Sequence, residues 1–380
     1  MKKFLDCISI VGATPSKFHG TKKYVSTGAV ATTEINESEV VEVTYEDRPS
    51  RANLSAEAGD ILFAKMQGTR KTLLLDSETE KNIYSTGFYA VRANPEVITT
   101  ECLYYLIDSE LFLAQKDKNC SGATQKAITN SGMAKIEISV PALSEQGILV
   151  DKLKHLTQLI TDKKKQLNLF DEIIKSRFIE LFGDPVSNQH GYEKVCLSEL
   201  ADIKIGPFGS LLHKEDYIEG GHPLLNPSHI IDGKVAPDNK LSISDKKYNE
   251  LSAYQLRVGD VVMGRRGEMG RCAVILDEGY LCGTGSLLIR TKGEVTADYI
   301  QKVISFPSFK KTIEDMAVGQ TMPNLNVPIV SAFQIIKPPI EVQNRFYAFV
   351  EQTDKSKLAI QQSLEKLETL KKALMQQYFG

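Results

Sequence analysis

A long stretch of this 380-residue sequence occurs twice, and this repetition restricts the possible folds more than any other feature. Residues 141–183 and 338–380 are equally long, lie 197 residues apart and both run from a proline to Phe-Gly. Gln146 recurs as Gln343, but literal identity is low. The shared feature is the spacing of the apolar positions, which an amphipathic helix preserves while individual residues change.

The same register extends upstream of these stretches. Residues 122–124 (Gly-Ala-Thr) match residues 319–321 (Gly-Gln-Thr) at the same offset of 197. Further upstream, residues 59–62 (Gly-Asp-Ile-Leu) match residues 259–262 (Gly-Asp-Val-Val) at an offset of 200, which requires only a short difference in length. We therefore predict that the whole chain is a tandem duplication.

The repeated stretches are predicted to be two long helices. Residues 144–181 contain no proline and a single glycine, and their apolar residues recur at steps of three, four and seven. At 1.5 Å per residue such a helix would be roughly 57 Å long. The second stretch, about 342–378, has the same pattern. Neither could bury its apolar face alone, so we expect an antiparallel coiled coil. The alternative is that each helix only closes its own domain.

The segments that precede each long helix have a different sequence pattern. Residues 1–140 and 186–337, which we call the first head and the second head, contain short apolar runs, such as those within 60–64, 260–263 and 273–276, separated by Gly, Pro, Asn and Asp. These are strand and turn signals. The expected fold class is therefore α+β, with two tandem α/β domains joined by spacer helices within 141–185 and 338–380.

Composition excludes several classes of protein. The formal net charge of -2 neither indicates nor excludes a polyanionic partner, because the clustering of Lys and Arg matters more than their total. The six cysteines form no closely spaced pair of the kind that a zinc site or redox motif requires. No apolar run approaches the ~18 residues of a membrane span. We expect a cytoplasmic protein with reduced thiols and no metal.

Catalytic motifs are also missing. The glycines of 264–270 have the spacing G-x-x-G-x-x-G, which differs from the dinucleotide fingerprint, and no Gly-Lys-Ser/Thr phosphate loop occurs. Residues 226–228 (Asn-Pro-Ser) come nearest to the Asn/Asp-Pro-Pro-aromatic turn of an adenine methyltransferase but lack the second proline. His213, His222 and His229 match no usual metal spacing. We expect no catalytic residue and no cofactor on this chain.

Basic side chains instead gather on matching loops of the two heads. Arginine suits phosphate oxygens and the O6/N7 edge of guanine. One loop seen alone would be interpreted as a solvated hairpin tip, but its recurrence favours nucleic-acid contact. The candidate residues are Arg265, Arg266 and Arg271 in the second head, and Lys65, Gln67, Arg70 and Lys71 in the first.

Two further surfaces are candidates. The turn Gly-Pro-Phe-Gly-Ser at 206–210 supplies Phe208 and Ser210, with Lys214 shortly after, and could approach a phosphate. The alternative is a plain turn packed by its phenylalanine. Asn and Gln can pair bidentately with adenine, although they serve turns and helix caps equally well. The amide-bearing set, with its neighbouring lysine, is Gln125, Lys126, Asn324 and Asn326.

Taken in order, four segments resemble the specificity-subunit family of Type I restriction-modification enzymes. They are 197–210 (Leu-Ser-Glu-Leu to Gly-Ser), 259–267 (Gly-Asp-Val-Val-Met-Gly-Arg-Arg-Gly), 319–326 and 338–343 (Pro-Pro-Ile-Glu-Val-Gln). The resemblance covers essentially the full chain. The first head departs from the pattern, since no Gly-Pro-Phe-Gly-Ser turn is recognisable in it.

This resemblance implies two target-recognition domains, each recognising one half of a bipartite, gapped site in double-stranded DNA. It implies that the paired helices set the spacing and dock two modification subunits, and that restriction subunits carrying a motor and a nuclease join the complex. S-adenosylmethionine, Mg²⁺ and ATP are then expected only on those partners. The chain itself would be a non-catalytic recognition subunit.

Two other functions stay open at this stage. A free-standing methyltransferase with a degenerate motif would bind the cofactor as an isolated chain. A coiled-coil adaptor that does not bind DNA would leave Arg265, Arg266 and Arg271 without a role. Neutralising these arginines separates the adaptor from the DNA-binding subunit.

Overall fold

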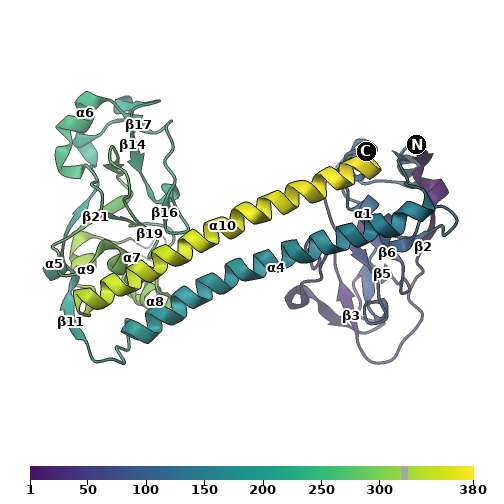
Figure 1. The fold of residues 1–380 in the computed structure, drawn as a ribbon, viewed down its shortest axis with the longest axis horizontal. Helices are drawn as coiled ribbons and strands as arrows, with labels where there is room; N and C mark the ends of the chain where they lie inside the picture. The colour runs from purple at the N-terminus through teal and green to yellow at the C-terminus, as the bar shows by residue number, and fades with distance from the viewer. Residues whose placement is uncertain (318–323) are drawn as a thin grey trace. The chain divides into compact units, whose positions relative to one another are not determined.

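The computed structural model describes residues 1–317 and 324–380, and the chain divides into two compact units. The first unit comprises Met1–Gln166 with Ile360–Gly380, and the second comprises Leu167–Ala359 (Figure 1). Each unit therefore contains one head, part of the first repeated stretch and part of the second. In the described part of the chain, no helix is long and apolar enough to cross a membrane.

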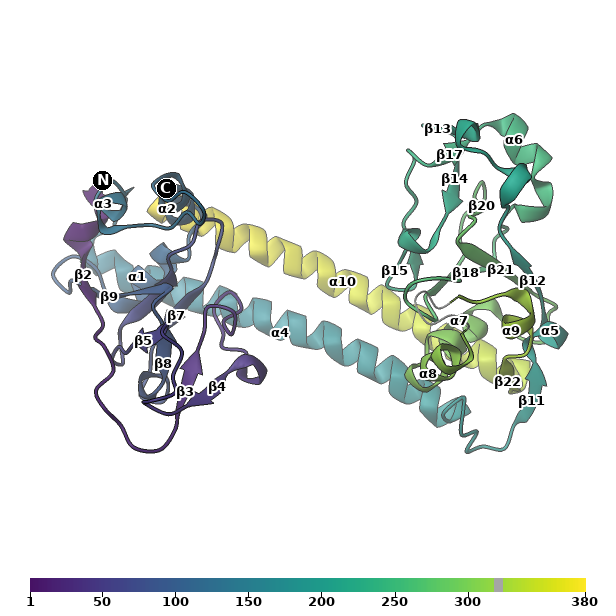
Figure 2. The same cartoon turned by 180° about the vertical axis from the view of Figure 1, so that it is seen from behind.

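The two repeated stretches form helices of 40 residues each, α4 (Leu143–Phe182) and α10 (Ile340–Phe379). In the first unit, Leu153 of α4 shares a core with Phe379 of α10. In the second unit, Phe182 packs against Phe346 with ring centroids 5.4 Å apart. The start of one helix thus lies beside the end of the other in each unit, as an antiparallel pair requires (Figure 2). The predicted helix pairing is confirmed.

Ion pairs also join the two helices within each unit. In the first unit Lys164 of α4 lies 3.0 Å from the Glu368 carboxylate of α10. In the second unit Lys357 of α10 lies 2.6 Å from the Asp171 carboxylate of α4. The interpretation that each helix only closes its own domain is therefore insufficient, because α4 and α10 also pack on each other.

The first head contains two four-stranded sheets and three short α-helices. One sheet has the antiparallel order β2 (Ile8–Val11), β9 (Phe88–Ala93), β6 (Ile61–Ala64), β7 (Thr72–Leu74). The other has the order β4 (Val41–Val43), β3 (Lys22–Val25), β8 (Ile83–Ser85), β5 (Ala52–Leu54). β1 (Lys2–Lys3) pairs with β10 (Glu137–Ile138), and the helices are α1 (Thr100–Ile107), α2 (Glu110–Lys118) and α3 (Asn130–Met133).

The second head repeats this plan. Its antiparallel sheet has the order β12 (Ala201–Ile205), β21 (Ser286–Thr291), β18 (Val261–Gly264), β19 (Cys272–Val274). Its other sheet has the order β13 (Tyr217–Ile218), β17 (Ser242–Ile243), β14 (His222–Leu225), β20 (Leu281–Cys282). The two-stranded pairs are β11 (Glu193–Cys196) with β22 (Gln334–Lys337) and β15 (Ile230–Ile231) with β16 (Lys234–Val235). The helices are α5 (Leu197–Leu200), α6 (Asp245–Glu250), α7 (Ala297–Ser305), α8 (Pro307–Met316) and α9 (Val327–Ser331).

The sequences of the inner strands β6 and β18 are continuous apolar runs because both faces of each strand are buried. Val261 and Met263 pack in the core that contains α7, whereas Val262 lies in a separate core on the other face. In the first head Phe63 and Leu62 divide between two cores in the same way. The alternation of strand side chains places successive residues on opposite faces. These strands therefore form a rigid base for the loop that follows each of them.

Single hydrogen bonds repeat between the units, which confirms the duplication at atomic detail. The buried side chain of Gln146 accepts from the backbone N–H of Thr99 at 2.7 Å, and that of Gln343 accepts from Thr296 at 2.9 Å. Both amides also donate to the carbonyl of the proline five residues earlier. The recurring glutamine thus joins each long helix to the loop before a head helix.

A buried carboxylate at the start of each central strand repeats as well. Asp60 accepts from Arg92 Nε at 2.7 Å, and Asp260 accepts from Arg290 Nε at 2.8 Å. Each carboxylate also accepts the backbone N–H three residues before it. The hydrogen bonds that Arg92 and Arg290 donate to these carboxylates raise the pKa of both arginines. The Gly-Asp signature found in the sequence therefore has a structural role.

Candidate nucleic-acid interface

The basic segments predicted from the sequence lie at matching places in the two heads. We call residues 65–71 the first loop and residues 265–271 the second loop. Each connects the third and fourth strands of its antiparallel sheet. The backbone N–H of Lys65 donates to the carbonyl of Gly87 at 2.9 Å, and that of Arg265 donates to Gly285 at 3.0 Å. The two loops therefore leave the sheet in the same way.

The last residue of each loop donates to an equivalent neighbouring segment of its own head. Lys71 Nζ donates to the carbonyl of Thr27 at 2.6 Å, and Arg271 Nη1 donates to the carbonyl of Pro227 at 3.2 Å. The two acceptors are 200 residues apart, as are the two donors. These cations hold the end of each loop, and they remain candidates for DNA contact.

The other candidate side chains of the first loop also make contacts within the head. The guanidinium of Arg70 lies against the buried Asp108, with Nε 3.1 Å from Oδ1, and this hydrogen bond raises the pKa of Arg70. The Lys65 ammonium lies 4.3 Å from the ring centroid of Tyr89, and burial lowers its pKa. Gln67 donates to a helix carbonyl at 3.2 Å. The first loop is therefore held by several side-chain contacts within its own head.

Sequence reasoning missed the residue that organises the first loop, Lys116 of α2. Its side chain is 1% exposed, and its Nζ donates to the carbonyls of Thr69 at 2.7 Å and Met66 at 3.1 Å. A third carbonyl, of Ala64, lies at 3.4 Å. Burial lowers the pKa of Lys116. Its position one turn after the buried Phe112 was the available signal.

The second loop presents its arginines differently. Arg265 Nε donates to Asn324 Oδ1 at 3.0 Å, and burial together with the adjacent Arg266 lowers the pKa of Arg265. The side chain of Arg266 is exposed, and its backbone forms a bridge with Asn324. The structure thus brings together Arg265, Arg266 and Asn324, three residues that the sequence nominated on two separate segments.

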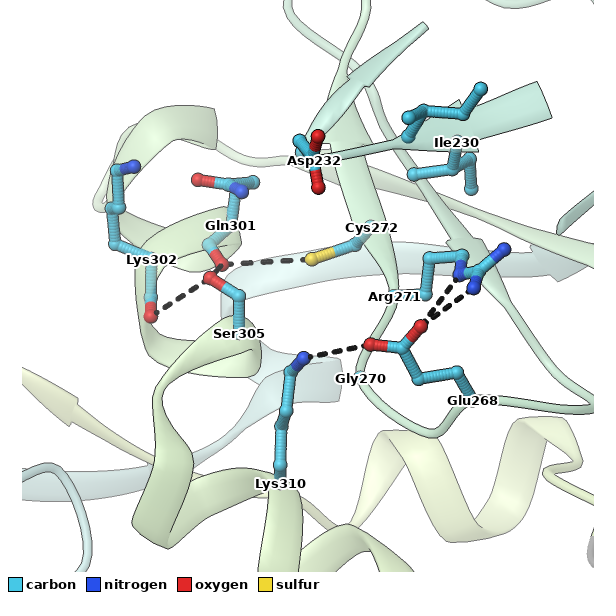
Figure 3. Close-up of a pocket in the computed structure, with 12 residues that line it drawn as sticks. Ile230, Asp232, Glu268, Gly270, Arg271, Cys272, Gln301, Lys302, Ser305 and Lys310 are labelled. Carbon is cyan, nitrogen blue, oxygen red and sulfur yellow. Dashed lines mark hydrogen bonds and ion pairs between the residues drawn. The ribbon is translucent and has the colours of Figure 1, made fainter. Parts of the chain in front are cut away.

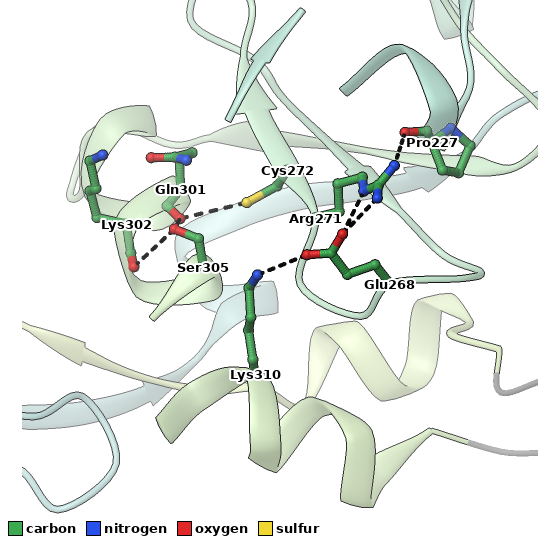
Figure 4. Close-up of polar contacts among 8 residues, drawn as sticks. All are labelled: Pro227, Glu268, Arg271, Cys272, Gln301, Lys302, Ser305 and Lys310. Carbon is green, nitrogen blue, oxygen red and sulfur yellow. Dashed lines mark hydrogen bonds and ion pairs between the residues drawn. The ribbon is translucent and has the colours of Figure 1, made fainter. Parts of the chain in front are cut away.

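The third arginine of the second loop belongs to an ion cluster that sequence reasoning did not find. Arg271 Nη2 lies 2.6 Å from Glu268 Oε2, while Lys310 Nζ of α8 lies 3.2 Å from Glu268 Oε1 (Figure 4). Both hydrogen bonds lower the pKa of Glu268. Glu268 could have been paired with Arg271 from their spacing of three residues, but Lys310 is distant in sequence and gave no signal.

The turn at 206–210 projects its candidate side chains outward. The Phe208 side chain is 61% exposed, and Ser210 and Lys214 are exposed. Gly206 lies so close to Gly283 that a Cβ at position 206 would be 2.0 Å from the Gly283 carbonyl oxygen. The exposure of Phe208 shows that this side chain does not pack the turn, whereas contact of the turn with DNA stays a prediction. In the first head, Gly12 follows β2 at the matching place, with a positive φ of 94°.

The amide-bearing candidates have different surroundings. Gln125 and Lys126 are exposed, and the carbonyl of Lys126 accepts from the backbone N–H of Gln67 at 2.9 Å. Asn326 caps α9, because its Oδ1 accepts from the backbone N–H of Ile329 at 2.9 Å. The helix-cap alternative is thus realised at Asn326. The matched glycine and threonine within 319–321 lie outside the described residues.

Comparison with known proteins gives a consistent result. A model of the Type I restriction modification DNA specificity domain matches residues 9–169 and again 189–371. The chain is 22% identical over 325 residues to the Type I restriction enzyme MjaIX specificity subunit of Methanocaldococcus jannaschii, covering 76% of this chain and 73% of that protein. It is 21% identical over 287 residues to the EcoKI specificity subunit of Escherichia coli, covering 70% of this chain and 61% of that protein.

Solved structures share the fold. One chain, from a study of complex assembly and conformational transition of the type I R-M system, superposes with a TM-score of 0.62 at 20% identity, over 98% of this chain and 97% of that chain. The S subunit of a Type I restriction-modification system from M. genitalium gives a TM-score of 0.57 at 13% identity, over 100% and 95% of the two chains.

Proposed function

Since this chain belongs to the Type I restriction-modification DNA specificity family, we propose that each head recognises one half of a bipartite DNA site. The observation that supports this proposal is the pair of loops. They occupy equivalent places on equivalent sheets, yet they carry different side chains, Lys65 and Gln67 in one and Arg265 and Arg266 in the other. Two loops on equivalent sheets that carry different side chains are suited to the recognition of different bases.

The exposed groups of the second head suit two kinds of contact. Arg266 is exposed beside Asn324, and an arginine fork can donate to both O6 and N7 of guanine. Ser210 and Lys214 near the exposed Phe208 suit phosphate oxygens, which fix register without carrying sequence information. A net charge of -2 is compatible with this function if partner subunits neutralise part of the DNA charge.

We further propose that α4 and α10 dock the modification subunits. Within the second unit, Leu169, Ile173 and Phe349 line an open groove along the two helices. Leu169 is 53% and Ile173 is 47% exposed, which is unusual for large apolar residues on a helix pair that is already packed. Exposed apolar surface of this kind marks protein–protein interaction sites.

Methylation and cleavage are assigned to the partner subunits in this proposal. S-adenosylmethionine, Mg²⁺ and ATP would then bind those subunits, and this chain would act without catalysis of its own. The proposal is tested by titrating S-adenosylmethionine into the isolated chain in a calorimeter. No binding heat is expected. Saturable binding would support the alternative of a degenerate methyltransferase.

The function is tested by sequencing DNA for modified adenines after co-expression of the chain with its modification subunit. We expect methylation at one bipartite, gapped motif, and we expect that it is lost when this chain is omitted. An adaptor would co-purify with the modification subunit and leave methylation independent of the arginines of the second loop.

The spacer role of the helices is tested by changing the length of both helices. Inserting one heptad into both helices, after Gln166 and after Ala359, preserves their contacting faces and adds about 10 Å. The gap between the half-sites is then expected to lengthen by about three base pairs, since each base pair rises ~3.4 Å. An unchanged gap would contradict the spacer role.

A further inference from the structure

Glu268 lies between two cations that come from different elements of the second head. Arg271 belongs to the same loop, and Lys310 projects from α8 (Figure 4). The side chain of Glu268 is 54% exposed, whereas those of Arg271 and Lys310 are 35% and 32% exposed. The anion is therefore the most exposed member of the cluster.

Beside the cluster lies a cavity of about 360 Å³, large enough for a group much bigger than a water molecule. Figure 3 shows Lys302 and Ser305 of α7 on its wall, together with Glu268, Arg271 and Lys310. Five charged side chains line the cavity: Arg271, Lys302 and Lys310 are cationic, whereas Asp232 and Glu268 are anionic. When Glu268 moves aside, three cations face the single carboxylate of Asp232. The space and the charge both suit a tetrahedral oxyanion, for which lysine and arginine are the usual protein partners.

We propose that the Glu268 carboxylate occupies a phosphate site of the second head and yields Arg271 and Lys310 to a backbone phosphate when DNA binds. The inference rests on the proposed function, because it requires that the second loop face DNA. Glu268 would then limit the affinity for DNA, because a backbone phosphate must compete with the Glu268 carboxylate for Arg271 and Lys310. Because phosphates carry no sequence, this limit acts equally on target and non-target DNA.

The first head lacks this arrangement. The residue at the place of Glu268, 200 positions earlier, is Gly68. Lys71, the counterpart of Arg271, donates to a backbone carbonyl rather than to a carboxylate. The limit on affinity therefore acts through one head only, and the first head serves as an internal comparison.

The charge change is tested with Glu268→Gln in the full chain assembled with its modification subunits, using short duplexes with and without the methylated motif. Freeing the two cations is expected to tighten binding of both duplexes about 3- to 5-fold at low salt, the range of exposed ion pairs. The slope of log K against log salt should steepen by about one.

The matched control is Glu278→Gln, which removes the same charge from an exposed position beyond the other end of β19. It should leave affinity and slope unchanged. If Glu268→Gln binds DNA no more tightly than Glu278→Gln, the proposal is overturned.

A second variant separates phosphate binding from a purely structural role of the cluster. If Lys310 contacts phosphate, Lys310→Gln weakens binding in the wild-type background and also in the Glu268→Gln background. If Lys310 only holds Glu268, its effect disappears in the second background, and the proposal is overturned. If the wild-type complex methylates no bipartite motif, the proposed function is contradicted. If the wild-type complex methylates such a motif but Glu268→Gln does not change DNA affinity, only this inference is contradicted.

Discussion

The first loop and the second loop leave equivalent sheets in the same way, but different interactions hold them in place. In the first head, the buried Lys116 donates to two carbonyls of the first loop and to the carbonyl of Ala64 at the end of β6. It therefore holds the loop from its buried side. In the second head, the residue at the matching offset is the buried, apolar Ile313, and the loop is held from its exposed side by Glu268 and Lys310. A duplicated fold has thus kept its backbone while exchanging the interactions that hold its loops.

This difference shows which parts of each head can vary. The buried carboxylates Asp60 and Asp260 and the glutamines Gln146 and Gln343 make the same contacts in both units. They fix the sheet and its junction with a long helix. The loops can diverge because their contacts are with helix α2 or α8 at the edge of the frame, so a new recognition surface does not require a new core.

The largest expected effect tests the common frame. Asp260→Ala removes a buried carboxylate from Arg290, and we expect a loss of about 3 kcal/mol in the free energy of unfolding. Asp60→Ala should cost less, about 2 kcal/mol, because Arg92 is more exposed and can rehydrate. Chemical denaturation measures both. The control Asp202→Ala removes an exposed carboxylate and should stay within about 0.5 kcal/mol of wild type. Negligible losses for both variants would contradict the structural role of the two carboxylates, and a loss at one site alone would contradict their equivalence.

The next effect distinguishes the two loops. Lys116→Met retains the apolar stem but leaves three carbonyls without their buried donor, at a cost of about 1 to 2 kcal/mol. We expect discrimination at one half-site to fall while the other half-site is read normally, as measured by methylation of mismatched duplexes. Lys118→Met, an exposed change on the same helix, is the control. Relaxed discrimination at both half-sites would show that Lys116 does not act through the first loop.

A change in the second loop should produce the reciprocal result. Arg266→Ala removes an exposed guanidinium, and we expect DNA binding to weaken by about 1 to 1.5 kcal/mol if it contacts a base. Discrimination should relax only at the half-site that Lys116→Met leaves intact. Methylation of duplexes with one altered half-site measures this directly, and a loss that is the same for all sequences would assign Arg266 to phosphate contact instead.

The smallest expected effect is a pH dependence that arises from Lys116, the residue that holds the first loop. Burial lowers the pKa of Lys116 in the folded state below its ordinary value of 10.5. The unfolded chain therefore binds more protons in the interval just below that value, so this group makes stability rise with pH there. The stability of wild type relative to Lys116→Met should increase across the interval in parallel denaturation curves. A difference that does not vary with pH would contradict a charged, desolvated lysine.

The helices were the most predictable part of the molecule. The expected range 144–181 became Leu143–Phe182, since uninterrupted apolar spacing over so many residues has few other solutions. The strands Ile61–Ala64 and Val261–Gly264 were also found, because short apolar runs between turn residues are local signals. The parallel pairing of β3 with β8 was not, since it depends on contacts between distant segments.

The candidate site was predicted in position but not in its contacts. Arg265, Arg266 and Asn324 do come together, and the sequence nominated all three. Lys116 and Lys310 were missed because each acts on a loop more than 40 residues away, and a lysine on a helix gives no local sign of its partner. Asn326 shows the opposite case, since a recognised residue type serves a local helix cap.

The central claim is that the two heads recognise separate halves of one DNA site. It is tested most directly by replacing residues 186–337 with the matching head of another family member and sequencing the methylated DNA. The account predicts that one half of the motif changes, while the other half and the gap are retained. A motif that changes in both halves, or in neither, would contradict it.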